Sequence, residues 1–171
     1  MDRGLTEFLI GRAPWLLLLA SVAVLGAALG SQYIGGLQPC VLCLYQRWPY
    51  VAVIVLCAGA LALRGRGMAG AALIGVGGLA LLAGAGIAAF HVGVEQHWWQ
   101  GTPACGGGVE LSRGSVDELR ERLLAAPVVR CDQVAWSLFG ISMAGYNLAV
   151  SLALGAAALY AAARLTGRRR S

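Results

Sequence analysis

Four long apolar runs dominate this chain and restrict its fold more than any other feature. They cover about residues 14–31, 42–63, 69–90 and 138–163. A helix needs about 20 residues, at about 1.5 Å each, to cross the hydrocarbon core of a bilayer, so each run is long enough to span it. Only 12% of the 171 residues are charged, whereas a soluble domain carries about 25%. The sequence therefore predicts a single all-α membrane domain, folded as an antiparallel four-helix transmembrane bundle.

The runs are rich in Ala, Leu and Gly, and such small residues let the backbones of membrane helices approach closely. Glycine costs a water-soluble helix about 1 kcal/mol, so we expect the glycines of the third run to mark packing faces. They are Gly75, Gly77, Gly78, Gly84 and Gly86. The first run exceeds the roughly 7–15 apolar residues of a signal peptide core, and we expect it to be retained as a span.

The distribution of arginine predicts the orientation of the bundle. The chain has no lysine, and most of its 13 basic residues lie before the first run, between the second and third runs, or after the last run. These are Arg3, Arg12, Arg64, Arg66, Arg164, Arg168, Arg169 and Arg170. By the positive-inside rule this face is cytoplasmic. We therefore expect a multi-pass protein of a bacterial inner membrane, with both termini cytoplasmic, periplasmic loops at about 32–41 and 91–137, and no nucleic-acid binding.

Four of the five cysteines fall in the two predicted periplasmic loops, in a compartment where disulfides form and persist. Cys40 and Cys43 form a C-x-x-C motif where the first loop meets the second run. Pro39 suits the start of a helix, and the three-residue offset places both sulfurs on one face of its first turn. A helix N-terminus favours thiolate over thiol, so we expect a redox-active pair. Cys57 lies in the middle of the run and is expected to be a small buried hydrophobe.

Arg47 stands one helical turn after Cys43, so its guanidinium can lie over the same face. A charge in the apolar zone costs about 2.5–3.5 kcal/mol on insertion scales and therefore indicates a function, here the stabilisation of a thiolate. The alternative is that Arg47 only reaches to the membrane interface beside Tyr45 and Trp48. Pro49 removes a helical hydrogen bond to the Tyr45 carbonyl, so we expect the helix to kink or to begin there.

Cys105 and Cys131 bracket a polar stretch of the long loop. Three glycines follow Cys105, and a sulfur with so little side-chain bulk around it can be approached by a partner protein. The alternative is a structural disulfide that closes a loop of about 26 residues. Between the two cysteines, residues 115–118 read as a capping box. With the apolar stripe at Val116, Leu119, Leu123 and Leu124, they predict a short amphipathic helix on the membrane surface.

The two histidines do not indicate a metal site. His91 ends the third run and His97 follows it. Zinc sites of the Cys/His type usually show two tight ligand pairs, and the separation of these histidines lies outside the usual H-x₃₋₅-H spacing. The motif C-x-x-C-H, which attaches c-type haem, does not occur in the sequence. We therefore expect no metal cofactor.

At these residues the chain resembles the bacterial disulfide bond formation protein B (DsbB) family. The resemblance covers the whole chain and rests on the C-x-x-C motif followed by Gln46 and Arg47, on the loop cysteines, and on residues 90–95 and 136–142. It implies a thiol:quinone oxidoreductase, in which a membrane quinone reoxidises a periplasmic thiol oxidase of the thioredoxin fold (DsbA-like). The DsbA–DsbB–quinone system keeps the bacterial periplasm oxidising.

The resemblance also implies a role for each cysteine. Cys105 would be attacked by the partner's thiolate to form a mixed disulfide, and Cys131 would be its redox mate. Cys40 would exchange with that pair, and Cys43 would be the thiolate that contacts the quinone. Thiol–disulfide exchange of this kind runs through mixed disulfides.

The quinone site implied by the resemblance consists of Cys43, Arg47 and His91, with Arg47 stabilising negative charge. Ubiquinone is the expected acceptor and menaquinone the second choice. Two other interpretations stay open. One is a vitamin K epoxide reductase-like enzyme, although that family has its C-x-x-C in a late span, after the loop pair. The other is a non-enzymatic membrane scaffold or metal-binding protein with structural disulfides, in which the C-x-x-C pair is inert to quinone.

Overall fold

The structure, a computed structural model, describes residues 3–63, 68–106 and 129–167. Its elements in chain order are α1 (Arg3–Gly11), α2 (Ala13–Tyr33), α3 (Val41–Tyr45), α4 (Arg47–Ala62), α5 (Met68–Glu95), the 3₁₀ helix η1 (Pro103–Gly106), β1 (Ser137–Leu138), β2 (Ile141–Ser142) and α7 (Met143–Gly167).

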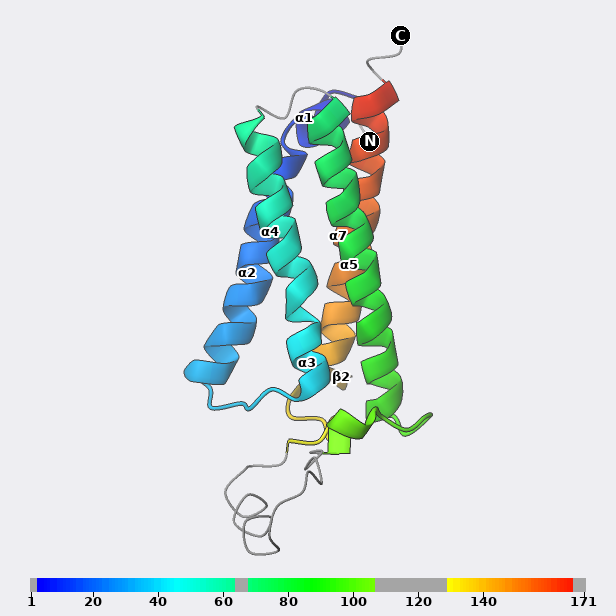
Figure 1. The fold of residues 1–171 in the computed structure, drawn as a ribbon. Coiled ribbons are helices and arrows are strands. Elements are labelled where there is room, and N and C mark those ends of the chain that lie inside the picture. The colour runs from blue at the N-terminus through cyan, green and yellow to red at the C-terminus, as the bar shows by residue number, and fades with distance from the viewer. Residues whose placement is uncertain (1–2, 64–67, 107–128, 168–171) are drawn as a thin grey trace, which may run out of the picture.

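Long helices run side by side from one end of the molecule to the other (Figure 1). Four segments of the described chain are long and apolar enough to cross a membrane, namely Ala13–Tyr33, Val41–Ala62, Met68–Glu95 and Met143–Gly167. The second of these consists of α3 and α4 in succession. The predicted fold class is confirmed: this is an all-α membrane protein.

The helices pack in the order α2, α4, α5, α7, and α2 touches α7 only lightly. Fully buried side chains fill the middle of the bundle, among them Val53, Cys57, Ile74 and Leu81. Cys57 is therefore the small buried hydrophobe that its position in the sequence predicts. Large apolar side chains also cover the outside of the spans, as a surface that faces lipid requires.

Glycines set the closest approach between the spans. A Cβ added to Gly78 would lie 3.1 Å from the carbonyl oxygen of Gly155, where α5 meets α7. A Cβ added to Gly84 would lie 2.9 Å from the ring of Pro49, where α5 meets α4. Both positions fit the predicted packing faces. The prediction is wrong for Gly86, because nothing lies within 4 Å of a Cβ added there.

A Gly78→Leu substitution is expected to destabilise the bundle. The new side chain would press on the α7 backbone, which cannot move aside as a flexible side chain can. Overpacking of this kind typically lowers the free energy of unfolding by about 1–3 kcal/mol. The matched control is Gly86→Leu, which gains the same helix propensity without the clash. Thermal unfolding in detergent measures both variants, and equal midpoints would contradict the packing role of Gly78.

α7 begins at Met143 rather than at about 138, because a small hairpin precedes it. β1 and β2 pair antiparallel, and the two residues between them, Phe139 and Gly140, have φ angles of 51° and 77°. Two successive positive φ angles are typical of a tight two-residue hairpin turn. The Ser142 hydroxyl then accepts a hydrogen bond of 3.1 Å from the N–H of Gly145 and caps the helix.

Two further boundaries differ from the sequence expectation. α5 continues to Glu95, past the predicted end at about residue 90. α1 is an additional helix before the first span, with Leu5, Phe8 and Leu9 exposed, as on a helix that lies at a membrane surface. The predicted amphipathic helix after Cys105 lies outside the described residues.

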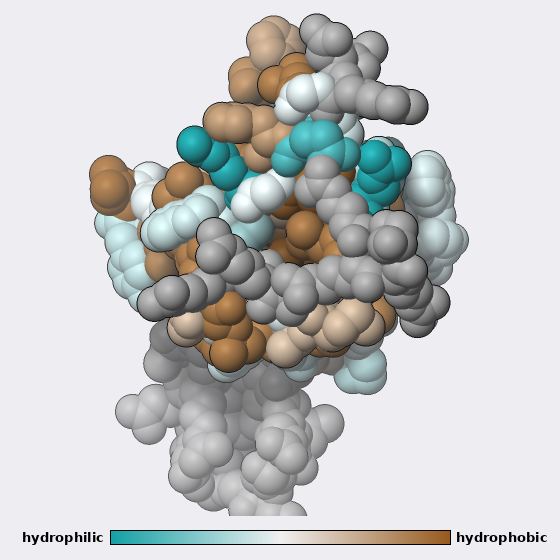
Figure 2. Space-filling model, turned by 90° about the horizontal axis from the view of Figure 1, so that it is seen from above, coloured by the Kyte–Doolittle hydropathy of each residue, from teal (hydrophilic) through white to brown (hydrophobic). Residues whose placement is uncertain are grey.

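The first and last helices meet at one end of the bundle, and α3 and η1 lie at the other end (Figure 1). Arg164 of α7 forms an ion pair of 3.3 Å with Glu7 of α1. Figure 2 looks onto this end, where hydrophilic and apolar side chains lie next to one another. The described ends of the chain therefore share one face of the bundle, which lies opposite the cysteines of the two motifs.

Candidate active site

The four cysteines that the sequence singles out come from separate segments of the chain and meet at the α3 end of the bundle. Cys40, Cys105 and Cys131 belong to one buried cluster, with exposed fractions of 5%, 5% and 0%. Cys43 packs against this cluster and is half-buried. All four are free thiols in this structure. The fold thus brings both predicted cysteine pairs into a single thiol cluster.

The first turn of α3 holds the C-x-x-C pair, as the sequence predicts. Cys40 is the N-cap residue, with φ −72° and ψ 171°, and its sulfur accepts a hydrogen bond of 3.3 Å from the Cys43 N–H. The two sulfurs lie 3.1 Å apart. The hydrogen bond with Cys43, followed by burial, raises the pKa of Cys40 to about 12. Cys40 therefore keeps its proton and donates it toward Cys43, an arrangement that suits Cys43 as the thiolate of the pair.

The second span is broken at Gln46, between α3 and α4. Pro49 has no N–H to offer the Tyr45 carbonyl, so the helix cannot continue without a break. The predicted kink or restart near Pro49 is confirmed. The break has a consequence for the site, because the Gln46 side chain turns into the bundle and is only 6% exposed as a residue.

Cys131 connects the two cysteine pairs. Its backbone N–H donates to the Cys105 carbonyl at 3.3 Å, and its side chain interacts with both Cys105 and Cys40. Burial, followed by the hydrogen bond with Cys105, raises the pKa of the Cys131 thiol. From this position Cys131 can exchange with either neighbouring thiol without a large movement of the chain.

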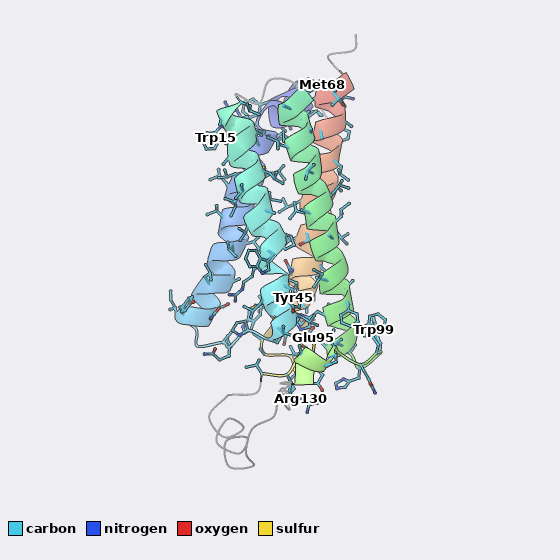
Figure 3. The ribbon with its side chains drawn as sticks, viewed as in Figure 1. Trp15, Tyr45, Met68, Glu95, Trp99 and Arg130 are labelled. Atoms are coloured by element: carbon cyan, nitrogen blue, oxygen red, sulfur yellow. The ribbon has the colours of Figure 1, made fainter. Side chains whose placement is uncertain are left out.

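Cys105 lies in η1, where its sulfur is 3.4 Å from the Thr102 hydroxyl. Because the sulfur is buried, it is not the open thiol that the glycine-rich sequence predicts. It lines a surface cavity of about 490 Å³, together with residues that include Trp98, Trp99, Arg130 and Asp132. Figure 3 shows Trp99 and Arg130 at the α3 end of the molecule, near η1. Among the described residues, this cavity is an opening that leads to Cys105.

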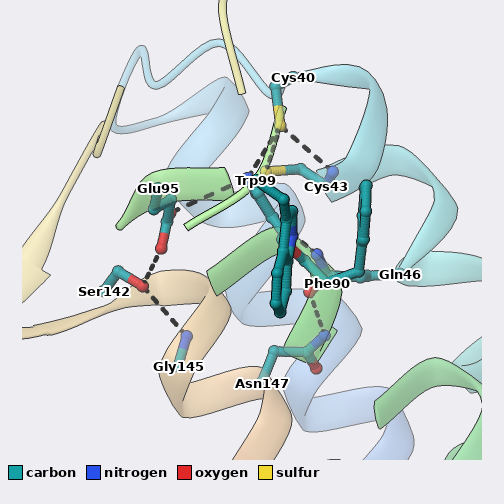
Figure 4. Close-up of polar contacts among 10 residues, drawn as sticks. Cys40, Cys43, Gln46, Phe90, Glu95, Trp99, Ser142, Gly145 and Asn147 are labelled. Carbon is teal, nitrogen blue, oxygen red and sulfur yellow. Dashed lines mark hydrogen bonds and ion pairs between the residues drawn. The ribbon is translucent and has the colours of Figure 1, made fainter. Parts of the chain in front are cut away.

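Trp99 folds back onto α5 beside the thiol cluster (Figure 4). Its ring stacks on Phe90 with centroids 6.0 Å apart, and its Nε1 donates to the Phe90 carbonyl at 2.9 Å. Gly93 makes this possible, because an added Cβ would overlap the indole ring. The indole therefore forms one wall of the cavity at Cys105.

His91 joins the thiols to a chain of buried polar groups, of which Gln46 and Asn147 are labelled in Figure 4. Its Nε2 lies 3.5 Å from the Cys40 sulfur, and its Nδ1 accepts a hydrogen bond of 2.8 Å from the Gln46 amide. Asn147 donates to the Gln46 carbonyl oxygen, and Tyr50 donates to the Asn147 carbonyl oxygen at 2.6 Å. Because Asn147 occupies the Gln46 oxygen, the Gln46 NH₂ faces the ring. This orientation of Gln46 corresponds to the tautomer with the His91 proton on Nε2, facing Cys40.

Glu95 lies one turn beyond His91 on α5. Its Oε1 is 3.9 Å from His91 Nε2, and its Oε2 accepts a hydrogen bond from the Ser142 hydroxyl. Since Ser142 also caps α7, this carboxylate ties the thiol end of α5 to the start of α7.

Sequence reasoning missed the polar chain behind His91, which includes Gln46, Tyr50, Asn147 and Ser151. A signal for it exists in the sequence. Asn147 and Ser151 are four residues apart within an apolar run, so they lie on one helix face. A polar side chain inside a span is costly without a partner, so this spacing indicates a buried polar contact.

Arg47 contacts α2 rather than the thiols. Its Nη1 donates to the Gln32 side-chain oxygen at 2.6 Å, and its Nη2 donates to the Ala28 carbonyl at 3.4 Å. These are the hydrogen bonds of Arg47 within the described residues. They hold the guanidinium against α2, whereas the sequence predicts that it lies over Cys43. A role of Arg47 at a quinone stays a prediction.

A four-span helical bundle that gathers two cysteine pairs at one end defines a membrane protein of thiol–disulfide chemistry. Comparison with known proteins identifies its kind. The model of the family "Disulfide bond formation protein DsbB" matches residues 11–161, and the chain belongs to this family. It is therefore a membrane protein that takes part in disulfide bond formation, and its general role is that of a disulfide-forming oxidoreductase.

Named relatives cover most of the chain. It is 36% identical over 146 residues to disulfide bond formation protein B of Aromatoleum aromaticum, covering 80% of this chain and 83% of the relative. It is 34% identical to the protein of that name from Azoarcus sp., covering 86% and 87%. For the Methylococcus capsulatus protein the identity is 33%, covering 90% and 91%. No solved structure matches the chain.

Proposed function

We propose that the protein reoxidises a periplasmic thiol oxidase of the thioredoxin fold, of the DsbA kind, and passes the electrons to a membrane quinone. The observation that carries the proposal is the meeting of both cysteine pairs at one end of the bundle, with Cys131 in contact with Cys40 and Cys105. Membership of the DsbB family favours this function over a vitamin K epoxide reductase-like enzyme or a scaffold.

The proposed exchange begins at the loop pair. A partner thiolate attacks Cys105 of the Cys105–Cys131 disulfide, and Cys131 leaves as a thiolate. The partner's second thiolate then displaces Cys105, which completes the partner disulfide. Cys131 attacks Cys40 of the Cys40–Cys43 disulfide and releases the Cys43 thiolate. Cys105 next attacks Cys131, which restores the loop disulfide and frees Cys40. One pair of electrons has then moved from the partner to the C-x-x-C pair.

The proposed outlet for these electrons is Cys43. It is the half-buried sulfur among the four, and its neighbours Leu44 and Tyr45 are 42% and 50% exposed on the outside of α3. A lipid-soluble quinone can therefore approach Cys43 from the bilayer side of the bundle. Cys43 gives up the electron pair as its bond to Cys40 forms, and two protons accompany the electrons. One partner dithiol and one quinone thus yield one partner disulfide and one quinol.

The test of this function mixes purified protein in detergent with a reduced thioredoxin-fold oxidase and a soluble ubiquinone analogue. The expected result is loss of quinone absorbance, with one quinone consumed for each partner disulfide formed. Cys43→Ser should abolish quinone reduction, whereas Cys57→Ala, at a cysteine far from the cluster, should not. Wild-type protein that leaves both quinone and partner unchanged would contradict the proposal. Menaquinone analogues in the same assay establish which quinone is preferred.

A Gly101→Ala substitution is expected to slow the exchange with the partner. Its new Cβ would lie 2.8 Å from the Cβ of Cys105 and 3.1 Å from the Cys105 sulfur, so the reactive sulfur must shift. A misplacement of about 1 Å can cost about 100-fold in rate. Rapid-quench gel assays of the mixed disulfide measure this rate. Gly86→Ala is the matched control, because its Cβ meets nothing within 4 Å. Equal rates in the two variants would show that the position of Cys105 is not critical.

The proposed orientation places both termini in the cytoplasm and the thiol cluster in the periplasm. A reporter fused after Ser171 is therefore expected to be active only if it functions in the cytoplasm. A membrane-impermeant thiol label should reach reduced Cys105 from outside intact cells whose outer envelope is permeable. The physical reason is the arginine bias toward the opposite face. A periplasmic C-terminus would contradict the orientation.

A further inference from the structure

The C-x-x-C pair and His91 together have the composition of a metal site. The two cysteine sulfurs and a ring nitrogen of His91 lie within 4.8 Å of one another. Tetrahedral zinc takes Cys and His ligands at about 2.3 Å and 2.0–2.1 Å, which corresponds to about 3.8 Å between two sulfurs and about 3.6 Å between sulfur and nitrogen. The structure has 3.1 Å and 3.5 Å. The two sulfurs have to move apart by a fraction of an ångström, and the Cys43 sulfur, which lies within 4.8 Å of the His91 nitrogen, has to come to about 3.6 Å from it.

We propose that the reduced C-x-x-C pair and His91 form a binding site for zinc or a closely similar divalent cation, and that bound metal blocks oxidation of the pair. The block on oxidation rests on the proposed function, whereas metal binding does not. The sequence argued against zinc because zinc sites usually show two tight ligand pairs and the two histidines lie outside the usual H-x₃₋₅-H spacing. The fold supplies the ligand pair differently, since it brings His91 of α5 against Cys40 at the start of α3.

The surroundings of the three ligands are those of a prearranged site. Cys40 and His91 are 5% and 2% exposed, and they are held by two different helices. The Cys43 N–H already donates to the Cys40 sulfur, and such a bond supports a metal-bound thiolate as well. Cys131 interacts with Cys40, so in the fully reduced protein its thiolate is the candidate fourth ligand. The resulting Cys₃His set is a common zinc-binding combination.

The polar chain behind His91 can adapt to a bound metal. A cation on Nε2 moves the ring proton to Nδ1, which then needs a hydrogen-bond acceptor. Gln46 can supply its carbonyl oxygen by turning its carboxamide, provided that Asn147 turns in the same sense. Tyr50 and Ser151 can follow, because each hydroxyl both donates and accepts. Gln46, Asn147 and Tyr50 can therefore reverse the direction of the hydrogen bonds that join them.

Binding is expected only in one redox state. Two thiols and a neutral imidazole bind one divalent cation and release two protons, with no change of oxidation state. In the Cys40–Cys43 disulfide no thiolate is left to bind. A metal on the reduced pair holds the electron pairs that would otherwise form the sulfur–sulfur bond. It therefore competes directly with electron transfer out of Cys43.

The test uses Co²⁺ as a spectroscopic probe on the full-length protein in detergent. Protein reduced with a phosphine and desalted should bind about one equivalent, with thiolate-to-cobalt absorption in the near ultraviolet that added Zn²⁺ removes. The oxidised wild type should show no such absorption, and this comparison needs no substitution. His91→Gln and Cys40→Ser should lose the signal. Gln46→Leu, which removes the support of His91, should weaken binding by about 10- to 100-fold.

Two control variants keep the assignment specific. His97→Asn changes the other histidine, and asparagine tolerates its positive φ of 59°. Cys57→Ala removes the cysteine in the bundle core. Both should bind Co²⁺ like the wild type. Reduced wild type without the absorption would overturn the metal site and leave the proposed function untouched. A full cobalt signal in a protein that never reduces quinone would instead overturn the proposed function and leave the metal site untouched. Zn²⁺ that binds the reduced protein but does not slow turnover would overturn the proposed block.

Discussion

A Cys131→Ala variant is expected to stop turnover and to accumulate a mixed disulfide between Cys105 and the partner oxidase. Cys105 lines the surface cavity, whereas Cys131 is fully buried behind it and contacts Cys40. Without Cys131, electrons have no path from the loop to the C-x-x-C pair. In this variant the Cys105 thiolate attacks the disulfide of the oxidised partner, which forms the mixed disulfide and releases the partner's other sulfur as a thiolate, and no Cys131 is present to displace the partner. Non-reducing gels and peptide mapping of the adduct measure the outcome.

Two comparison variants make this result decisive. Cys105→Ala should give no adduct, because it removes the sulfur that faces the cavity. Cys57→Ala should turn over normally, since Cys57 lies in the core of the bundle. If mapping instead finds the partner joined to Cys131 in the wild type or in Cys105→Ala, the order of the two loop cysteines is reversed.

The parts of the site that depend on local sequence could be predicted. The C-x-x-C offset, together with a helix start, is enough to place two sulfurs on one face, and they lie 3.1 Å apart. Pro49 breaks the second span because the missing N–H is a property of that residue alone. The four spans themselves follow from length and hydropathy, since the bilayer fixes how many residues a helix needs.

The parts that depend on contacts between spans could not be predicted. The partner of His91 is Gln46, and the partner of Gln46 is Asn147, so each link joins two different spans. No local pattern states which helix faces of a bundle meet. Arg47 shows the same limit, because its charge predicts a buried partner but not that the partner is Gln32 of α2.

Hydropathy alone also misplaces the start of the last span, because the apolar segment there lies in an exposed hairpin. Leu138, Phe139 and Ile141 are apolar, and their hydropathy alone extends the last span to include them. They form the exposed hairpin before α7 instead, and Phe139 is 90% exposed. The glycine that follows Phe139 is the residue that indicates the turn, because a two-residue hairpin loop favours positive φ there.

An Arg47→Ala variant is expected to insert normally and to reduce quinone about one to two decades more slowly. Loss of a charge-assisted contact costs about 1.5–3 kcal/mol, and each 1.36 kcal/mol is about tenfold in rate. Arg47→Lys should recover only part of the rate, because an ammonium keeps the charge but lacks the planar fork that can bind two acceptors. Exchange between the partner and the loop pair should be nearly unchanged, since that step does not use the quinone.

The Gln32→Leu variant is the control that separates an effect of the Arg47 charge on the quinone from an effect of the Arg47 contact with α2. Arg47 is bound to α2 through Gln32 and the Ala28 carbonyl, so Arg47→Ala also loosens the contact between α2 and α4. Gln32→Leu breaks the side-chain bond to α2 but leaves the guanidinium in place. If the charge acts on the quinone, Gln32→Leu should keep most of the wild-type rate in a steady-state quinone titration. If both variants lose rate and thermal stability in parallel, Arg47 acts as a tether between helices. Unchanged quinone kinetics in Arg47→Ala would show that Arg47 is only an interfacial anchor.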